Sequence, residues 1–260
     1  ITLTATGNID IKQAVLETNG ANLTFASTTG NITLTSSTGN GAIVSTAGCA
    51  LMAGNVCRNQ SFNFVQGGLQ TLTANNGTIK IEAPVAGGFG VALFSGGGQT
   101  ITANNVEVRG GLMSNAGYGG NDAWITNRSS SAGQTISAHT ILLQAGGQNS
   151  TLSTDRDNDA GIYSSAGLQT INITGTGGSL TLNGGAGGHN NAAAIYANSG
   201  GQVLNVHGAV SINGGNANGT YQNFAEISSS ADQTINIYDG GSITINGGAG
   251  DGYGLDQFFN

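Results

Sequence analysis

The most regular feature of this sequence is an alternation of apolar and polar residues that begins, repeatedly, at a glutamine. Residues 134–138 read Gln-Thr-Ile-Ser-Ala, and residues 233–237 read Gln-Thr-Ile-Asn-Ile. A period of two predicts a β-strand with one buried face. The glutamines that open these segments recur about every 33 residues, at Gln70, Gln99, Gln134, Gln169, Gln202 and Gln233.

Two further apolar segments follow each glutamine and complete the repeat. The first lies at 79–81, 106–108, 141–143, 180–182, 210–212 and 243–245, and the second at 91–93, 160–163, 193–196 and 224–227. Three short strands joined by glycine-rich turns match one coil of a parallel β-helix, which buries its aliphatic side chains between stacked coils. We therefore predict an all-β solenoid with three short strands per coil and about nine coils. A β-sandwich of hairpins is the alternative, but it does not need the same residue types at the same position of every repeat.

Residues at equivalent positions of neighbouring repeats support the stacking. Alignment of the second strands places Lys80 beside Glu107 and Glu82 beside Arg109, which predicts two ion pairs between adjacent coils. Stacked asparagine amides form hydrogen-bonded ladders, and we expect the glycines that follow them to supply unusual backbone angles. The asparagines that precede Gly-Gly in three successive repeats are Asn183, Asn213 and Asn246.

The repeats divide the chain into three parts. Residues 1–48 contain shorter repeats, with equivalent segments at 7–11 and 30–34, and we interpret them as short coils of the same β-helix. Residues 49–64 fit neither repeat, and we expect an extra-helical loop there, closed by a disulfide between Cys49 and Cys57; two buried free thiols are the alternative. Residues 65–260 would form six glutamine-anchored coils. Because the last coil stops partway and has no polar cap, we expect a slice of a longer rod.

The composition narrows the class of protein. Gly supplies 46 residues and Pro one, which disfavours helices, and 38% hydrophobic residues with 7% charged residues disfavour disorder. The net charge of −7 disfavours binding to nucleic acid or anionic lipid. No apolar run reaches the roughly 18 residues of a membrane helix, so we expect no membrane insertion.

The repeats at 7–11, 30–36 and 169–185 resemble those of the filamentous haemagglutinin-like exoproteins of bacterial two-partner secretion. The resemblance covers nearly the whole chain and is one of repeat style. It implies a right-handed β-helical rod that is exported through an outer-membrane two-partner secretion transporter and acts in adhesion, aggregation or biofilm structure. The secretion domain of this family carries Asn-Pro motifs, whereas the only proline here is Pro84, preceded by Ala83. The resemblance therefore implies an interior or distal part of such a rod.

Asp155, Asp157 and Asp159 form the only dense acidic cluster, and Gly161 follows them. Carboxylates two residues apart with a glycine nearby are typical of the first half of a calcium loop, so calcium is the candidate cation. The closing carboxylate of such a loop is missing from 162–167. A solvated acidic turn is the alternative. We expect no other cofactor.

The loops before the third strand vary most between repeats. They lie at 111–123, 147–159, 185–192, 214–223 and 248–254, and stacking would place them along one edge of a rigid scaffold, where binding usually resides. Trp124, Tyr163 and Tyr196 follow these loops, and the two tyrosines precede their glutamines by the same interval, which predicts one column. An exposed aromatic stripe is a candidate glycan contact. A structural aromatic ladder is the alternative.

The sequence carries no recognisable catalytic motif: it lacks a nucleophile elbow, a metalloprotease helix motif and zinc-spaced Cys and His residues. We therefore predict a non-enzymatic shaft of a secreted, extracellular bacterial surface exoprotein. Its loop edge would contact a glycan or protein of a host or bacterial cell. The alternative is a β-helix that binds or cleaves carbohydrate, in which Asp122 and the acidic cluster on the adjacent coil would act across a groove.

Overall fold

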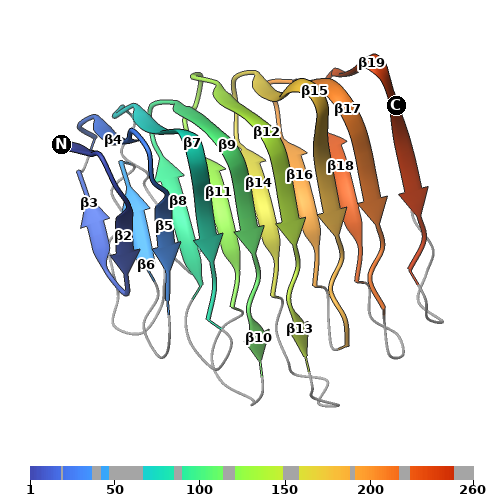
Figure 1. Ribbon diagram of the computed structural model, residues 1–260, viewed down its shortest axis with the longest axis horizontal. Helices are drawn as coiled ribbons and strands as arrows, with labels where there is room; N and C mark the ends of the chain where they lie inside the picture. Colours follow the sequence, from blue (N-terminus) through green and yellow to red (C-terminus); the bar gives the residue numbers. More distant parts are fainter. Residues whose placement is uncertain are drawn as a thin grey trace.

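The computed structural model describes residues 1–18, 20–36, 42–46, 67–84, 90–113, 121–148, 158–187, 191–216 and 223–248. All secondary structure in these residues is β, and every strand pair is parallel. Figure 1 shows the strands side by side along the longest axis of the molecule, and within each large sheet they follow the chain from its N-terminal to its C-terminal end. Within the described ranges there is no helix of the length and apolarity needed to cross a lipid bilayer.

Two large parallel sheets face each other across the core. The ten-stranded sheet contains β1 (Thr2–Ala5), β2 (Ile9–Lys12), β4 (Leu23–Ser27), β5 (Ile32–Thr35), β7 (Gln70–Glu82), β9 (Gln99–Arg109), β12 (Gln134–Gln144), β15 (Gln169–Asn183), β17 (Gln202–Asn213) and β19 (Gln233–Asn246). The seven-stranded sheet contains β3 (Val15–Glu17), β6 (Ala42–Ser45), β8 (Val91–Ser95), β11 (Ala123–Asn127), β14 (Ala160–Ser164), β16 (Ala193–Ala197) and β18 (Ala225–Ser229). A small third sheet pairs β10 (Leu112–Met113) with β13 (Gly147–Gln148).

The chain alternates between the two large sheets, and we call one passage through both of them a coil. Each strand pairs with the equivalent strand of the next coil, as β12 does with both β9 and β15. This arrangement of parallel strands in stacked sheets is consistent with a parallel β-helix, as the repeats predict. The hairpin sandwich, which requires antiparallel neighbours, does not describe these residues.

The expectation of three separate short strands per coil is wrong for the longer coils. The first and second expected strands form one continuous element there, such as β7 and β9, whereas they remain separate as β4 and β5, which both pair with β7. In β7 both segments pair with β9, and a register shift between Ala74 and Thr78 separates the two stretches of pairing. The alternating pattern does not distinguish a bend in a strand from a break.

The core is a single column of aliphatic side chains between the sheets. Alternate residues of each long strand point inward, as in β12, where Ile136, Ile141 and Leu143 are fully or almost fully buried. Burial of such side chains is the main favourable term in folding, at roughly 1.5–3 kcal/mol each. A repeat that presents an aliphatic residue at the same position in every coil therefore stabilises the stack along its whole length.

The six repeat glutamines form a continuous amide ladder, in which the first five are buried in this interior and Gln233 is half-buried. Each donates from Nε2 to Oε1 of the preceding glutamine, over 2.5–2.8 Å, from Gln99 to Gln70 and onward to Gln233. Most also contact a carbonyl oxygen of the seven-stranded sheet, as Gln134 does at Tyr163 O (3.2 Å). Because these amides are satisfied, their burial is tolerated. The ladder connects neighbouring coils and also connects the two sheets.

The Gly-Gly pairs act through close packing and not through unusual backbone angles, so that expectation is wrong. Gly184, Gly185, Gly214 and Gly215 do not have positive φ. A Cβ on Gly185 would instead overlap the carbonyl oxygen of Gly146 in the preceding coil. The same overlap recurs along one column of glycines, which contains Gly111, Gly146, Gly185, Gly215 and Gly248.

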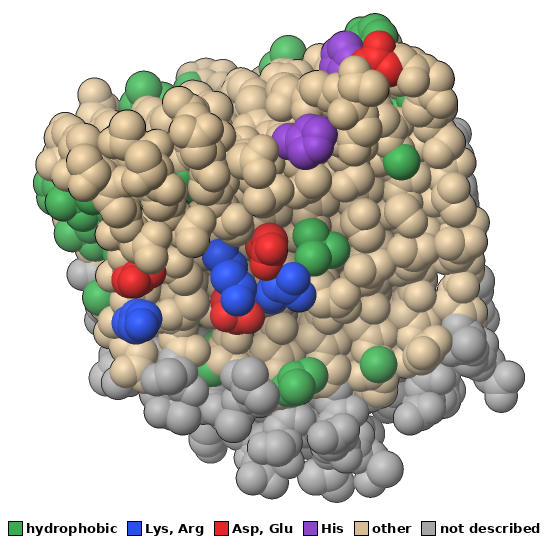
Figure 2. All heavy atoms as spheres, in the orientation of Figure 1, with side chains coloured by type: hydrophobic (Ala, Val, Ile, Leu, Met, Phe, Trp, Pro, Cys, Tyr) green, Lys and Arg blue, Asp and Glu red, His purple; other side chains and the backbone are tan. Residues whose placement is uncertain are grey.

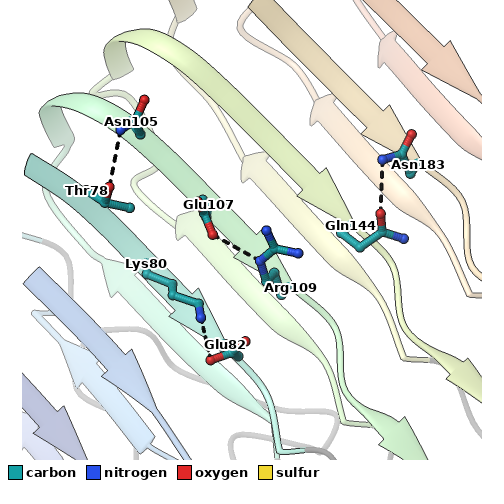
Figure 3. Close-up of polar contacts among 8 residues, drawn as sticks. All are labelled: Thr78, Lys80, Glu82, Asn105, Glu107, Arg109, Gln144 and Asn183. Atoms are coloured by element: carbon teal, nitrogen blue, oxygen red, sulfur yellow. Dashed lines mark hydrogen bonds and ion pairs between the residues drawn. The ribbon is translucent and has the colours of Figure 1, made fainter.

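The predicted register of the charged residues is confirmed, but the predicted ion pairs are not. Lys80 lies beside Glu107, and Glu82 lies beside Arg109, on adjacent strands. The pairs that form run along each strand: Lys80 Nζ lies 2.8 Å from Glu82, and Arg109 Nε lies 3.0 Å from Glu107. Figure 3 shows both pairs, each within its own strand. Residues two apart on a strand share a face, so each charge has an opposite charge both along and across the strands.

Several predictions fall on residues outside the described ranges. These are the disulfide between Cys49 and Cys57, the loop at 49–64 that separates the two expected kinds of coil, and the carboxylates of Asp155 and Asp157. The boundaries 1–48 and 65–260 therefore remain predictions.

Candidate functional site

Four variable loops leave and re-enter the stack at equivalent positions. At each base a glycine N–H donates to an asparagine carbonyl oxygen: Gly111 to Asn121 (2.8 Å), Gly146 to Asn158 (2.7 Å), Gly185 to Asn191 (2.9 Å) and Gly215 to Asn223 (2.7 Å). The segments between these partners are 112–120, 147–157, 186–190 and 216–222, so their lengths differ while their bases do not. The bases stack on one another through the glycine column, and the loops therefore start along one edge of the stack.

A buried asparagine ladder fixes the re-entry side of this edge, and the repeat analysis did not find it. The Oδ1 of Asn158 accepts the backbone N–H of Asn121 (3.1 Å), and the Oδ1 of Asn191 accepts that of Asn158 (3.0 Å). Asn223 does the same for Asn191 (2.9 Å). These side chains are buried, so the loop edge has a rigid base. The signal in the sequence is an asparagine two residues before the alanine that opens each of the four strands β11, β14, β16 and β18.

Asp122 and Asp159 lie next to this ladder on adjacent coils. Each carboxylate accepts a hydrogen bond from a backbone N–H group of the next coil. The Oδ1 of Asp122 accepts the N–H of Asp159 (3.1 Å), and the Oδ1 of Asp159 accepts the N–H of Ala192 (2.8 Å). Asp159 is thus the one described member of the predicted calcium cluster, and it has a structural contact. Among the described residues, no three His, Cys, Asp or Glu side chains group into a metal site.

The two tyrosines of the predicted column are in register, on β14 and β16. Their ring centroids lie 5.6 Å apart with an interplanar angle of 26°, which is a stacked arrangement. The hydroxyl of Tyr196 lies 2.7 Å from Ser230 Oγ. The Cζ of Arg128 lies 4.6 Å from the centroid of Tyr163. Burial lowers the pKa of Arg128 from its usual value, and the electrostatic interaction with Tyr163 partly opposes this. The described contacts of the column are those of an aromatic ladder that joins adjacent coils.

Trp124 lies in a neighbouring outward column, not in the tyrosine column. It is in register with Gly161, whereas Tyr163 is in register with Thr126. The indole occupies the space that a Cβ on Gly161 would need. Trp124 is half-buried, so the three candidate glycan contacts do not form one continuous stripe.

The outward face of the ten-stranded sheet carries two further polar ladders. The expected ladder is confirmed: Asn213 donates to Asn183 (2.8 Å) and Asn246 donates to Asn213 (2.7 Å). It extends one coil further, since Asn183 donates to Gln144 Oε1 (3.0 Å), as Figure 3 shows. The second ladder was not predicted, and it runs through Ser137, Asn172, Asn205 and Asn236. Figure 2 shows that most of this face is uncharged, with a cluster of acidic and basic side chains near its middle and a few further charged side chains toward the left and the top.

A hollow of about 380 Å³ lies on this face, between the second ladder and the next outward column of residues. Ser137, Asn172 and Asn205 line one side, and Thr174, His207 and Tyr238 line the other. The rings of His207 and Tyr238 stack with centroids 4.7 Å apart. The Nδ1 of His207 lies 2.7 Å from a carboxylate oxygen of Asp239.

Comparison of this chain with protein-family models, with curated proteins and with solved structures finds no match to any of them.

Proposed function

We propose that this protein is a non-enzymatic shaft segment of a secreted bacterial surface exoprotein that acts in adhesion, aggregation or biofilm structure. In this proposal the chain is a right-handed β-helix of about nine coils. The loops along one edge make the contacts with a glycan or protein of a host or bacterial cell, and export occurs through an outer-membrane two-partner secretion transporter.

The observation that carries the proposal is the uniform loop base. The same glycine-to-asparagine hydrogen bond closes segments of four different lengths, and a buried amide ladder joins the re-entry points. A scaffold that remains constant while its loops vary is typical of proteins that bind through loops. The described carboxylates next to this edge, Asp122 and Asp159, hold backbone N–H groups, which supports a structural role for the residues below the loops.

The interior ladders support the shaft part of the proposal. Each coil presents the same aliphatic positions and the same glutamine to its neighbours, so coils add to the stack without a new kind of interface. Such a structure holds loops at fixed positions along its axis. Adjacent coils are about 4.8 Å apart, which places successive loops close enough to bind one partner together.

The test is adhesion of beads coated with the protein to bacterial and epithelial cells. The key variant replaces segments 112–120, 147–157, 186–190 and 216–222 by Gly-Ser linkers of the same lengths and keeps the glycines and asparagines of the bases. We expect the wild-type protein to retain beads on one of these cell types, and the variant to lose retention while its circular dichroism spectrum stays that of β-structure. Retention that survives in the variant, or that is absent for the wild type on both cell types, contradicts the proposal.

A further inference from the structure

The hollow beside the second asparagine ladder has hydrogen-bonding capacity that the fold does not use. An amide side chain offers two N–H donors and an oxygen with two lone pairs. Asn172 donates once, to Ser137 Oγ (3.1 Å), and accepts once, from Asn205 (3.0 Å). Asn205 in turn accepts once, from Asn236 (2.9 Å). Each of these two amides therefore keeps one donor and one lone pair, and both side chains lie on the outward face of the sheet.

These spare groups repeat at a fixed interval. Asn172 and Asn205 are in register on β15 and β17, so they are separated by the strand spacing of about 4.8 Å. Their side chains are half-buried, and the ladder holds each amide in one orientation. A ligand with neighbouring groups that both donate and accept, such as hydroxyls, matches this pattern.

The opposite side of the hollow supplies a flat, partly apolar surface. Tyr238 is 42% exposed, and its ring stacks on that of His207, which covers one face of each ring and leaves the rest of the Tyr238 ring accessible. The carboxylate of Asp239 can only accept a hydrogen bond, so the Nδ1 of His207, 2.7 Å away, donates to it. A tyrosine ring offers a large apolar surface to a ligand, and its hydroxyl adds a polar group at one end.

The charge and size of the hollow restrict the ligand further. None of its lining residues is Lys, Arg, Asp or Glu, so it offers no fixed cation to an anionic group. A volume of about 380 Å³ lies within the range of small-molecule sites, roughly 300–1,000 Å³. The hollow lies on the outward face of the ten-stranded sheet, whereas the loop bases connect to the seven-stranded sheet.

We propose that this hollow is a binding site for an uncharged saccharide segment, whose hydroxyls pair with Asn172 and Asn205 while a ring face rests on Tyr238. The site is separate from the loop edge and does not depend on the function proposed for it. The tyrosine column on the other sheet is a weaker candidate, because the guanidinium of Arg128 covers the ring of Tyr163 and the hydroxyl of Tyr196 pairs with Ser230.

The experiment is an NMR titration of the full chain with three neutral hexasaccharides: cellohexaose, maltohexaose and chitohexaose. With at least one probe, the side-chain amide signals of Asn172 and Asn205 shift and saturate. Tyr238→Ala weakens that affinity about five- to tenfold, and Tyr238→Phe, which keeps the ring, retains it. The control variant Tyr196→Ala removes a tyrosine from the other sheet and leaves the affinity unchanged.

Three outcomes overturn the proposal. The first is the absence of saturable shifts at both amides with all three probes. The second is an equal loss of affinity in Tyr196→Ala and Tyr238→Ala. The third is tighter binding of hexagalacturonate than of every neutral probe, because the ligand class would then be anionic. None of these outcomes bears on bead adhesion through the loops, so the two proposals fail independently.

Discussion

Gln134 donates from its Nε2 to the Oε1 of Gln99 over 2.6 Å, and both side chains are almost fully buried. Each glutamine of the interior ladder is thus a donor to one coil and an acceptor for the next. A missing member leaves a buried oxygen on one side and a buried N–H on the other. The stability of the stack therefore depends on polar residues in its core as well as on aliphatic ones.

Replacement of Gln134 by Leu tests this dependence. Gln99 Oε1 loses its donor, and Gln169 Nε2 loses an acceptor at 2.8 Å. A buried group left unsatisfied costs about 1–3 kcal/mol, so we expect the free energy of unfolding to fall by about 2–4 kcal/mol in urea titrations. Gln144→Leu is the matched control, because it makes the same change at the outward end of the same strand. An equal loss in both variants would show that burial of the ladder is unimportant.

Gly146→Ala tests the close packing of the glycine column. The new Cβ would overlap the carbonyl oxygen of Gly111, and backbone cannot yield as a flexible side chain does. We expect a loss of about 1–3 kcal/mol, measured by urea denaturation. Gly7→Ala serves as the control, since no atom lies within 4 Å of its Cβ position and its φ is not positive. A stable Gly146→Ala variant would contradict the packing argument.

Gly161→Ala reports on Trp124, the only tryptophan of the chain. A methyl group at position 161 occupies the space of the indole, which must swing outward into solvent. We expect the fluorescence emission of Trp124 to shift to longer wavelength while the β-structure measured by circular dichroism is retained. Ala194→Gly, at the next position of the same column, removes a methyl group and is the control. An unchanged emission spectrum in Gly161→Ala would place the indole elsewhere.

The carboxyl group of Glu226 makes the stability of the folded stack depend on pH. Burial raises the pKa of this carboxyl above 4.5, and a hydrogen bond with Ser228 offsets part of the rise. The folded protein thus holds the proton more tightly than the unfolded chain. This contribution to stability is complete below about pH 4.5 and is lost as the pH rises through the pKa of the folded state.

We therefore expect Glu226→Gln, which cannot ionise, to melt at a higher temperature than the wild type at neutral pH. The difference between the two should disappear as the pH falls below 4.5, where Glu226 is protonated in both states. Thermal melts from pH 4 to pH 8 measure it, with the variant's own pH profile as the baseline. A difference that stays constant over this range would rule out the ionisation of Glu226 as its cause.

The register of the stack could be predicted because identical residues recur at equivalent positions. Lys80 and Glu107 were placed side by side from the repeat alone, as were Asn183 and Asn213. The same alternation also placed Gln134 on the face of Ile136 and Ala138, so the burial of the glutamine could have been inferred from it. That inference was missed because glutamine is usually found at the surface.

Other features could not be predicted, because they depend on side-chain conformation or on packing between coils. Lys80 has an acidic neighbour along its strand and another across it, and only its rotamer decides between Glu82 and Glu107. The sequence Gly184-Gly185 is compatible with a strained turn or with tight stacking, and the backbone of the adjacent coil determines which applies. The hollow beside Asn205 depends on the stacking of His207 and Tyr238, which no motif encodes.

Because the loop bases are uniform, the sequences of the loops can change independently of the sequence of the shaft. The segment between Gly146 and Asn158 and the segment between Gly215 and Asn223 have the same kind of base. In both, the glycine donates to the asparagine carbonyl oxygen, packs against a glycine of the preceding coil, and lies beside the asparagine ladder. Insertions and exchanges between these positions therefore leave the core sequence untouched. The protein is in this respect a ready acceptor for grafted peptides, displayed at a spacing that the strands set.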